Sequence, residues 1–551
     1  MAGTAEHPDP DIFEAEAADE AAEGGGDAVT GVSSWGISII LHAIILLVLA
    51  FVVYQSLQEK KDAPLVHTVI PPSREPEAPP PHVDIRTDVR VDVPIPVPDS
   101  VVHDLDVPVE KLETQDDEPT NDVKGREDAV AAMEMGSTAF MPAMGADAGA
   151  PGMRGRPRGG RHRGVPGSGC TPRCLDAADG ALRWFARHQS PNGQWDVDGY
   201  PLNCQDAGAK CEPGTSHSDI QGDVACTGYA LLCFLGSGYD HRAPSRFQRI
   251  VKQGVDWLLS VQSADGCFGK RNYEHPVATM ALAEAYAMTN DQELREPVQR
   301  AVDLIRARQA QGTATTAVSG QQVGDYGLGW DYVKPNFHRM DSSVSGWNVM
   351  ALKSAKLGGI DVGDALDGAR QWLTGAWEAM NRQIGVDLAD LDVYAGQTQF
   401  PYTWNGSDNK VSTHNGDLTC VGLLCAVFLG AEDRQLKTMA NWCFAHQTPK
   451  GWPTDTYYLY YNTLGMFQVG GEQWEAWNGQ VRDMLLDAQR RDGGCFAGSW
   501  DPQGAGGHHI SEVGRLLVTA YCCMSLQVYY RYDAVRADPK DERSRKLKAA
   551  F

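Results

Sequence analysis

The stretch Trp184–Trp195, WFARHQSPNGQW, is the first copy of a frame that recurs along the second half of the chain. In this frame an aromatic or large apolar residue is followed five positions later by a glutamine, and then by a glycine and a second aromatic residue. Further copies begin at Trp257, Leu304, Trp442 and Met484, and Gln371-Trp372-Leu373 marks a degenerate sixth copy. Recurrence of this kind is typical of repeat proteins, in which each unit buries its apolar face against its neighbours.

Each copy of the frame predicts the end of an amphipathic helix. The glycine supplies the left-handed conformation that stops the helix, and the glutamine amide can bond the backbone exposed beyond it. The second aromatic residue is expected to staple the turn to the next repeat. In the third copy, Gly329-Trp330 completes the frame only after an insertion.

More apolar helices, rich in small residues, are expected between these frames. They cover Asp223–Gly238, His275–Thr289, Asp341–Leu357, Gly416–Gly430, Asp455–Gly470 and Ser511–Tyr530. Their apolar residues run nearly all round the helix, which predicts burial. Six mixed-polarity helices alternating with six buried ones predict an all-α fold of about six helical hairpins. Hairpins packed side by side can close into an α/α toroid with the buried helices inside, and an open solenoid is the alternative.

The rest of the chain differs from the repeat region in composition. We expect a disordered acidic N-terminus over 1–34, a membrane helix over 35–54, a disordered Pro/Gly-rich linker over 55–169, the toroid over 175–532 and a charged tail over 533–551. The formal net charge of −24 argues against a nucleic-acid binder, because phosphate binding needs a basic face.

The segment Trp35–Tyr54, WGISIILHAIILLVLAFVVY, predicts a single transmembrane helix in the cytoplasmic membrane. It is uncharged and about 30 Å long as a helix, and its terminal aromatic residues suit the two membrane interfaces. Ser38 and His42 lie on one face of this helix, and polar residues at this depth usually serve a function. Lys60 and Lys61 after the helix favour a cytoplasmic C-terminus.

The Ser-x-x-x-His pattern, followed by the proline-rich stretch IPPSREPEAPPP at 70–81, resembles the anchor of TonB-type energy transducers. The resemblance implies that Ser38 and His42 contact an ExbB/ExbD-like proton-channel complex. It also implies that everything after the anchor, the toroid included, is periplasmic or extracytoplasmic. No TonB C-terminal domain follows the anchor.

The repeat frame, with TGYALLCFLGSGYDH at 227–241 and VSGWNVMALKSAKLGG at 344–359, resembles the QW repeats of the squalene/hopene cyclase and protein prenyltransferase superfamily. It is most similar to the squalene-cyclase-like repeat proteins of bacterial envelopes, which implies the closed toroid. In cyclases of this family the proton donor is the third residue of an Asp-x-Asp-Asp-Thr motif. The aligned position here holds Met340, which argues against cyclase chemistry.

The leading hypothesis is therefore a membrane-anchored envelope protein whose cyclase-like toroid binds a ligand or partner without cyclase activity. One alternative is a terpene cyclase or prenyl-transfer enzyme acting on an isoprenoid substrate. A second alternative is a TonB-like envelope protein coupled to a motor. The sequence leaves open whether the protein is an enzyme.

Candidate site residues come from the N-terminal ends of the buried helices, which converge at one mouth of a ring. Histidines and carboxylates gathered there make the default site, although acidic residues also cap helices. The catalytic candidates are Asp341, His275, His414 and His509. The ligand-binding candidates are Asp455, Tyr457, Tyr458 and Tyr461, as an aromatic wall for an apolar or isoprenoid ligand, with core packing as the alternative reading of the tyrosines.

Most of the 13 cysteines lie in apolar helical stretches and are expected to be core residues. Those in loops are Cys170, Cys174, Cys204 and Cys211, which can pair in three ways and predict disulfides of an oxidising compartment. A zinc site built from Cys204, Cys211 and His217 has irregular spacing. We therefore expect no metal and no cofactor.

Topology can be tested with an alkaline phosphatase fusion after residue 170 in a bacterial host. The expected result is an active phosphatase, because the TonB-like anchor places the following residues outside the cytoplasm. A fusion over the same residues that lacks 35–54 serves as the control and should be inactive. An inactive full-length fusion would place the toroid in the cytoplasm.

Overall fold

The computed structural model describes residues 171–531, except 205–208, 214–219, 414–416 and 503–512. The predicted membrane helix with Ser38 and His42, the N-terminus, the linker, the charged tail, His414 and His509 all lie outside the described residues. Within the described ranges, no helix combines the length and the apolar character needed to cross a membrane.

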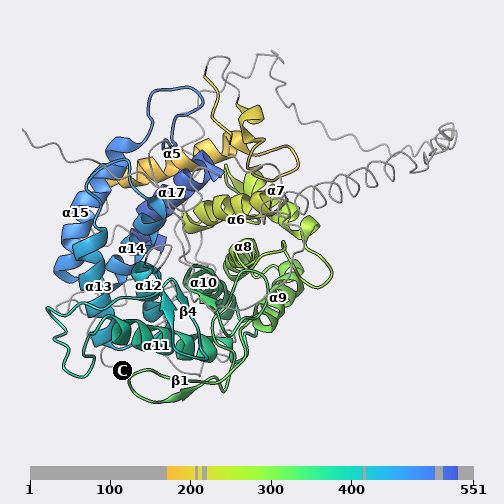
Figure 1. Cartoon of the computed structure of the whole chain (residues 1–551). Helices are drawn as coiled ribbons and strands as arrows, with labels where there is room; N and C mark the ends of the chain where they lie inside the picture. The colour runs from red at the N-terminus through yellow and green to blue at the C-terminus, as the bar shows by residue number, and fades with distance from the viewer. Residues whose placement is uncertain (1–170, 205–208, 214–219, 414–416, 503–512, 532–551) are drawn as a thin grey trace, which may run out of the picture. The chain divides into compact units, whose positions relative to one another are not determined.

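Six amphipathic helices form the outer layer of the repeat region (Figure 1). They are α5 (Pro172–His188), α7 (Gln248–Val261), α9 (Gln292–Ala307), α11 (Ala365–Gln383), α13 (Asp433–Gln447) and α15 (Gly471–Ala488). Their buried residues recur at intervals of three and four, as Val251, Val255 and Leu258 do in α7. This spacing gives each helix one apolar face toward the interior and one polar face toward solvent.

Six further helices form the inner layer and are buried nearly all round. They are α6 (Ile220–Gly236), α8 (Glu274–Thr289), α10 (Ser342–Leu357), α12 (Thr419–Leu429), α14 (Thr456–Val469) and α17 (Arg515–Arg531). Each inner helix packs against the next, and α17 packs against α6, so the inner layer is a closed ring (Figure 1). The predicted all-α toroid of six hairpins is confirmed, and the open solenoid is excluded.

Little other regular structure occurs among the described residues. A short 3-10 helix, η4 (Tyr200–Asn203), follows α5. The strands are β1 (Ala314–Thr315), β2 (Gln322–Val323), β3 (Met340–Asp341), β4 (Thr403–Trp404) and β5 (Val411–Ser412). The first two pair antiparallel, and the last three form an antiparallel sheet in the order β3-β4-β5. These strands lie in the connections from α9 to α10 and from α11 to α12, within the third and fourth hairpins, and leave the ring all-helical.

The glutamine of the repeat frame joins neighbouring hairpins. In the first copy, the Gln189 side-chain amide donates to the carbonyl of Gly193 in its own turn and to that of Ile250 in α7, both at 2.9 Å. In the third copy, Gln309 donates in the same way to Leu328 at 2.6 Å and to Ala365 at 2.9 Å. One side chain thus holds a turn and fixes the next outer helix against it.

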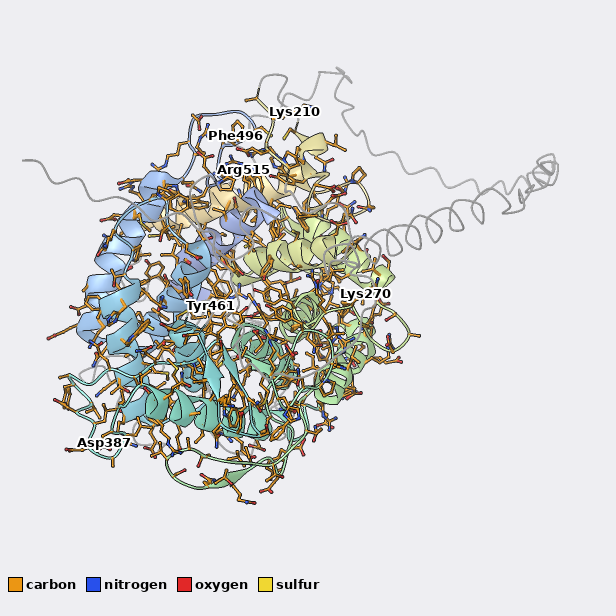
Figure 2. The ribbon with its side chains drawn as sticks, viewed as in Figure 1. Lys210, Lys270, Asp387, Tyr461, Phe496 and Arg515 are labelled. Atoms are coloured by element: carbon orange, nitrogen blue, oxygen red, sulfur yellow. The ribbon has the colours of Figure 1, made fainter. Side chains whose placement is uncertain are left out.

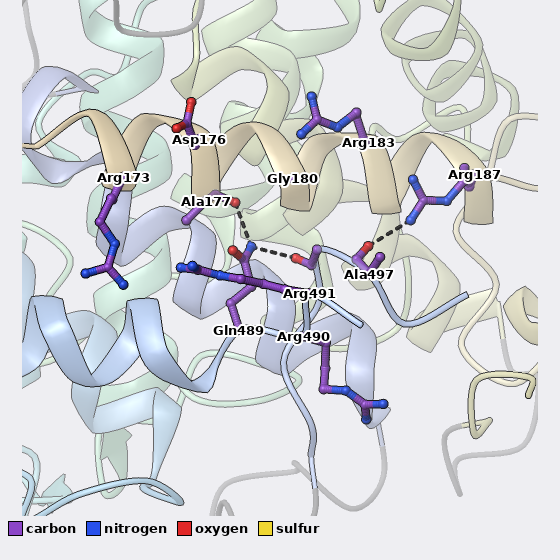
Figure 3. A pocket seen from close by; sticks show the side chains of 11 residues that line it. Arg173, Asp176, Ala177, Gly180, Arg183, Arg187, Gln489, Arg490, Arg491 and Ala497 are labelled. Atoms are coloured by element: carbon purple, nitrogen blue, oxygen red, sulfur yellow. Dashed lines mark hydrogen bonds between the residues drawn. The ribbon is translucent and has the colours of Figure 1, made fainter. Parts of the chain in front are cut away.

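The last glutamine closes the ring. The Gln489 amide donates to the carbonyl of Gly498 at 2.9 Å and to that of Ala177 in α5 at 2.7 Å (Figure 3). Ala177 belongs to the first hairpin, so the sixth hairpin bonds the first hairpin in the way that Gln189 and Gln309 bond the next hairpin along the chain. We call this junction, between the last hairpin (α15 and α17) and the first (α5 and α6), the seam.

The seam is also held by a buried ion pair between inner helices. Arg531 in α17 donates to Glu284 in α8 at 2.8 Å, and both side chains are fully buried. The same guanidinium donates to the carbonyl of Leu232 in α6 at 2.6 Å. A buried charge without its partner is strongly destabilising, so Arg531 fixes α17 in one position against α6 and α8.

The helix-stop role predicted for the glycine needs a correction. Helix α5 ends at His188, and the following Gln189 is already extended. Gly193 has φ of 101° within the turn beyond, where an added Cβ would lie 2.2 Å from the carbonyl oxygen of Gln253. The glycine therefore permits the close approach of the next outer helix, and the glutamine itself ends the helix.

The aromatic residue that was expected to staple the turn to the next repeat bonds the outer helix of its own repeat in three copies, with one change of residue. The indole N–H groups of Trp195 and Trp330 donate at 2.8 Å to carbonyls near the ends of α5 and α9. In the last repeat, Trp500 makes this bond, to the Leu485 carbonyl at 2.9 Å. Phe496, which the frame assigned to this place, lies instead under the guanidinium groups of two arginines.

The middle of the ring is filled by aromatic side chains from non-adjacent inner helices. Trp347 of α10 contacts Tyr229 of α6 at a centroid distance of 5.3 Å and Tyr461 of α14 at 6.0 Å. Figure 2 shows Tyr461 within the ring. Tyr460 stacks on Tyr521 of α17 at 5.6 Å. All five side chains are buried. The inner helices are thus held apart, and held in place, by a packed aromatic core.

Replacement of Gln309 by alanine tests the bridging role of the frame glutamine. Gln309→Ala leaves the buried carbonyls of Leu328 and Ala365 without their donor, which costs about 2–5 kcal/mol of unfolding free energy at about 1–3 kcal/mol per unsatisfied group. The measurement is urea unfolding followed by tryptophan fluorescence. Gln292→Ala, at an exposed glutamine of the same hairpin, should change stability by less than about 0.5 kcal/mol. Equal losses in the two variants would contradict the bridging role.

Candidate functional site

A pocket of about 280 Å³ lies between the start of α12, the end of α13 and the start of α14. The residues that define its chemistry are Asp417, His446, Gln447, Asp455, Tyr458 and Leu459. Because every inner helix follows an outer helix that runs the opposite way, all inner helices begin on one face of the ring. The pocket lies on that face, as predicted for a site.

Asp417 is the most buried carboxylate of the pocket. Its Oδ1 accepts the backbone N–H of Thr419 at 2.9 Å and the Thr419 hydroxyl at 2.5 Å. Burial raises the pKa of Asp417, and the hydrogen bonds from Thr419 only partly offset this. The Tyr458 hydroxyl donates to the Asp417 carbonyl at 3.2 Å, which joins two walls of the pocket.

Asp455 and His446 contribute groups in different surroundings. Asp455 caps α14 and accepts the Tyr457 N–H at 3.0 Å. The His446 ring stacks on Trp442 at 4.6 Å, and its Nδ1 lies 2.9 Å from the Trp442 carbonyl. Because a carbonyl can only accept, Nδ1 carries the proton and Nε2 keeps its lone pair. The pocket therefore combines two partly buried carboxyl groups, one of them with a raised pKa, with an exposed imidazole, a set suited to proton transfer.

The predicted ligand-binding residues divide between this pocket and the core. Asp455 and Tyr458 line the pocket. Tyr457 and Tyr461 contact each other at 4.8 Å within the central aromatic core and are fully buried. The helical turn of α14 explains the division, because residues 457 and 461 share one face while 458 lies on the next. The pocket thus contains two of the four predicted ligand-binding residues, and one of the three tyrosines of the predicted aromatic wall.

The predicted catalytic residue His275 has both ring nitrogens engaged inside the protein. Its Nδ1 accepts the Phe268 N–H at 3.3 Å, and its Nε2 donates to the Ala301 carbonyl at 3.0 Å. Burial lowers the pKa of His275 to about 4, so the ring is neutral at pH 7. His275 connects α8 to α9, outside the pocket.

Asp341, the other described catalytic candidate, caps α10. Its Oδ1 accepts the N–H groups of Ser343 at 2.9 Å and Val344 at 3.2 Å, and its Oδ2 pairs with Arg339 at 2.9 Å. Burial raises the pKa of Asp341. The fully buried Asp341 stands outside the pocket, and capping, the alternative interpretation of such acids, accounts for its contacts.

His446 and Gln447 were missed by the sequence analysis because they end an outer helix. The predicted site residues were all taken from the starts of the inner helices, whereas the outer helices end on the same face of the ring. Gln447 is the frame glutamine of its repeat, but it accepts from Asn462 of α14 at 2.9 Å. The pair His446-Gln447 repeats His188-Gln189 of the first frame, a signal that could have drawn attention to both histidines.

A second pocket, of about 340 Å³, lies at the seam between α5 and the turn after α15 (Figure 3). Its arginines are Arg173, Arg183, Arg187, Arg490 and Arg491. Arg173, Arg183 and Arg490 are already paired with carboxylates, and the other two donate to backbone carbonyls. Carboxylates thus balance three of the five charges, while the guanidinium groups of Arg187 and Arg491 are held by neutral carbonyls.

Comparison with known proteins gives similarity at the level of structure alone. No family model matches the chain, and no curated protein matches it. An α-1,6-mannanase of Salegentibacter sp. HEL1_6 aligns at 11% identity and a TM-score of 0.42, over 64% of this chain and 98% of its own. A D-mannose isomerase aligns at 12% and 0.43, over 66% and 99%. The unsaturated glucuronyl hydrolase of Bacillus sp. GL1 aligns at 14% and 0.41, over 65% and 99%.

These comparisons correct the family relationships inferred from the sequence. The proteins that align are named as glycoside hydrolases and an isomerase, not as squalene/hopene cyclases, prenyltransferases or TonB-type transducers. The three hypotheses built on those relationships, an envelope-anchored cyclase-like toroid, an isoprenoid enzyme and a motor-coupled protein, are withdrawn. The structure agrees, since the proton-donor position holds the fully buried Met340 and the middle of the ring is packed with aromatic rings.

The raised pKa of Asp417 predicts a pH-dependent effect of Asp417→Asn on stability. An acid whose folded pKa lies above its unfolded pKa of about 3.9 destabilises the folded state as the pH rises past that value. Asparagine keeps the acceptor for Thr419 but cannot ionise, so the variant should melt at a higher temperature than the parent at pH 8. The difference should vanish near pH 3.

The control is Asp408→Asn, at an exposed aspartate whose pKa is lowered by its hydrogen bond from Lys410. This substitution should give no gain in melting temperature at pH 8. Thermal unfolding of both variants between pH 3 and pH 8 makes the measurement. A melting temperature of Asp417→Asn that falls below the parent value as the pH rises would contradict the assigned burial of the carboxyl.

Proposed function

We propose that the toroid is an enzyme that acts on a small polyhydroxylated substrate of the carbohydrate class, in the pocket between α12, α13 and α14. The observation that carries the proposal is the placement of a buried carboxyl with a raised pKa, Asp417, in one pocket with a second carboxylate, Asp455. A pair of carboxyl groups in unequal surroundings is the arrangement that supplies one acid and one base at the same pH.

The lining of the pocket supports a sugar over other ligands. A volume of about 280 Å³ suits one or two sugar rings. Carboxylate, carboxamide and imidazole groups accept and donate hydrogen bonds at many points, as a ligand with several hydroxyl groups requires. Among the described residues, no lysine or arginine lines the pocket, which disfavours phosphorylated ligands, and the polar lining disfavours isoprenoids. Tyr458 provides a ring on which a sugar face can pack.

The pocket groups suit cleavage of a glycosidic bond. Asp417, whose pKa is raised by burial, donates a proton to the leaving oxygen as the bond from the anomeric carbon to that oxygen breaks. Asp455 accepts a proton from the water whose oxygen forms the new bond to the anomeric carbon. Asp455 then releases this proton to solvent and Asp417 takes one up, so that atoms and charge balance.

A second candidate reaction is the interconversion of an aldose and a ketose. It is favoured by His446, whose Nε2 has a lone pair that makes no hydrogen bond within the described part of the chain. An imidazole so placed can move a proton between neighbouring carbons of an open-chain sugar. The two reactions differ in their products. Hydrolysis produces new reducing ends, whereas isomerisation keeps the number of sugar molecules and moves the carbonyl group to the neighbouring carbon.

The test is incubation of the full chain with a panel of oligosaccharides and monosaccharides, followed by product analysis by NMR. Asp417→Asn should lower kcat by about 10²–10⁴-fold, the usual contribution of a general acid, with substrate binding retained. Activity of the parent should fall as the pH rises through the pKa of Asp417, because the acid form is needed. Asp408→Asn serves as the control and should retain full activity.

The possible results separate the candidates. New reducing ends that depend on Asp417 support hydrolysis, whereas a new ketose or aldose that depends on His446 supports isomerisation. Absence of both turnover and binding across the panel, or turnover unaffected by both Asp417→Asn and His446→Ala, would overturn the proposal.

A further inference from the structure

Three cysteines and one histidine from distant parts of the chain converge at the seam. His188 is the last residue of α5, Cys204 follows η4, Cys211 lies in the loop beyond it, and Cys495 lies in the turn after α15. One ligand atom from each residue, the histidine nitrogen or the cysteine Sγ, lies within 4.8 Å of all the others. All four side chains are buried, with at most 9% of any of them exposed.

The distances fit a tetrahedral site. The Nε2 atom of His188 lies 3.3 Å from the Sγ of Cys204, 3.5 Å from that of Cys211 and 3.0 Å from that of Cys495. The sulfur atoms of Cys211 and Cys495 are 3.6 Å apart. A zinc ion with bonds of about 2.3 Å to sulfur and about 2.0 Å to nitrogen requires separations of about 3.6 Å for N···S and about 3.8 Å for S···S. Shifts of a few tenths of an ångström would complete the tetrahedron.

The histidine is held in the orientation that a metal ligand needs. Its Nδ1 lies 2.7 Å from the Trp184 carbonyl, which fixes the proton on Nδ1 and the lone pair on Nε2. The ring stacks on the Trp184 indole at 4.4 Å, which fixes its plane. The lone pair therefore points at the three sulfur atoms, and a carbonyl bonded to the far nitrogen is the usual support of a metal-bound histidine.

The neighbours of Cys211 and Cys495 hold the loops that carry them. Glu212 pairs with Arg515 of α17 through two bonds, of 2.7 Å and 2.9 Å. The same guanidinium lies over the ring of Phe496, next to Cys495, at 4.7 Å. Arg515 is fully buried and also pairs with Asp501 at 2.7 Å, so it ties the loops of Cys211 and Cys495 to α17 through two carboxylates.

We infer that His188, Cys204, Cys211 and Cys495 form a zinc site that ties the first hairpin of the toroid to the sixth. All four coordination positions come from the protein, which is the pattern of a structural zinc site rather than a catalytic one. The site is independent of the proposed function, since it lies at the seam while the pocket lies between the fourth and fifth hairpins. Three thiol protons leave as the three Zn–S bonds form, and no electron is transferred.

The alternative chemistry for these cysteines, the predicted disulfides, fits less well. Cys204, Cys211 and Cys495 are free thiols. A bond between Cys211 and Cys495 requires about 2.05 Å between the sulfur atoms, well below 3.6 Å, and would leave Cys204 and His188 buried without a role. His217 of the set Cys204, Cys211 and His217 lies outside the described residues, whereas His188 and Cys495 complete a set of four that sequence spacing did not reveal.

The direct test is elemental analysis of the full chain purified under reducing conditions without chelators. The expected content is about one zinc ion per chain, reduced at least tenfold in Cys495→Ala and Cys211→Ala, because each removes one ligand of four. Cys425→Ala is the matched control, since Cys425 is an equally buried free thiol of α12 that lies outside the cluster, and it should retain the zinc.

A second measurement keeps the test valid if the ligand variants fail to fold. The unaltered chain, with its metal exchanged for Co²⁺, should show the intense visible bands of tetrahedral cobalt and a near-ultraviolet band of thiolate ligation. Removal of the metal with a chelator should lower the melting temperature by several degrees or more, and added zinc should restore it. The inference would be overturned if the purified chain held no metal while all its thiols were reduced. It would also be overturned if Cys425→Ala lost as much zinc as the ligand variants, or if the mass of the chain were lower by two hydrogen atoms, which indicates a disulfide.

Discussion

The hydrogen bonds of the frame glutamines are the interaction on which the ring depends. At Gln189, Gln262, Gln309 and Gln489 the amide reaches both its own turn and the next outer helix, so a local helix end also sets the position of the following hairpin. Repetition of this step turns the chain round the ring, and Gln489 completes it by bonding Ala177 in the first hairpin. The aromatic core then fills the middle, and Arg531 fixes the last inner helix.

The sequence predicted the toroid well, because its determinants are local and repeated. The apolar periodicity, the frame glutamine and the second aromatic residue of the frame can each be recognised within a short stretch of sequence. All three contribute to packing in the structure. Phe496 was assigned a role that belongs to Trp500, because spacing alone cannot tell which aromatic residue of a long turn reaches the helix end. Family membership could not be read from the frame, since the frame encodes how helices pack and not what a pocket does.

The functional sites were predicted less well, because their residues meet only through ring closure. His188 and Cys495 are far apart in the chain and adjacent in space, so no spacing pattern could join them. Asp455 and Tyr458 were found from their place at a helix start, whereas His446 escaped notice at the end of an outer helix. The pocket and the proposed zinc site have separate roles. The zinc site would help to keep the ring closed at the seam, and the closed ring positions the helices that form the walls of the pocket.

Hydrogen exchange of the full chain, compared between the parent and Gln489→Ala and read by mass spectrometry, tests the closed ring most directly. If the seam joins the last hairpin to the first, loss of the Gln489 bonds should speed exchange in α15 and in α5 together, although α5 lies at the other end of the folded region. Helix α10, on the opposite side of the ring, should keep its protection. Faster exchange confined to α15 and α17, with α5 unchanged, would contradict the account and describe an open array.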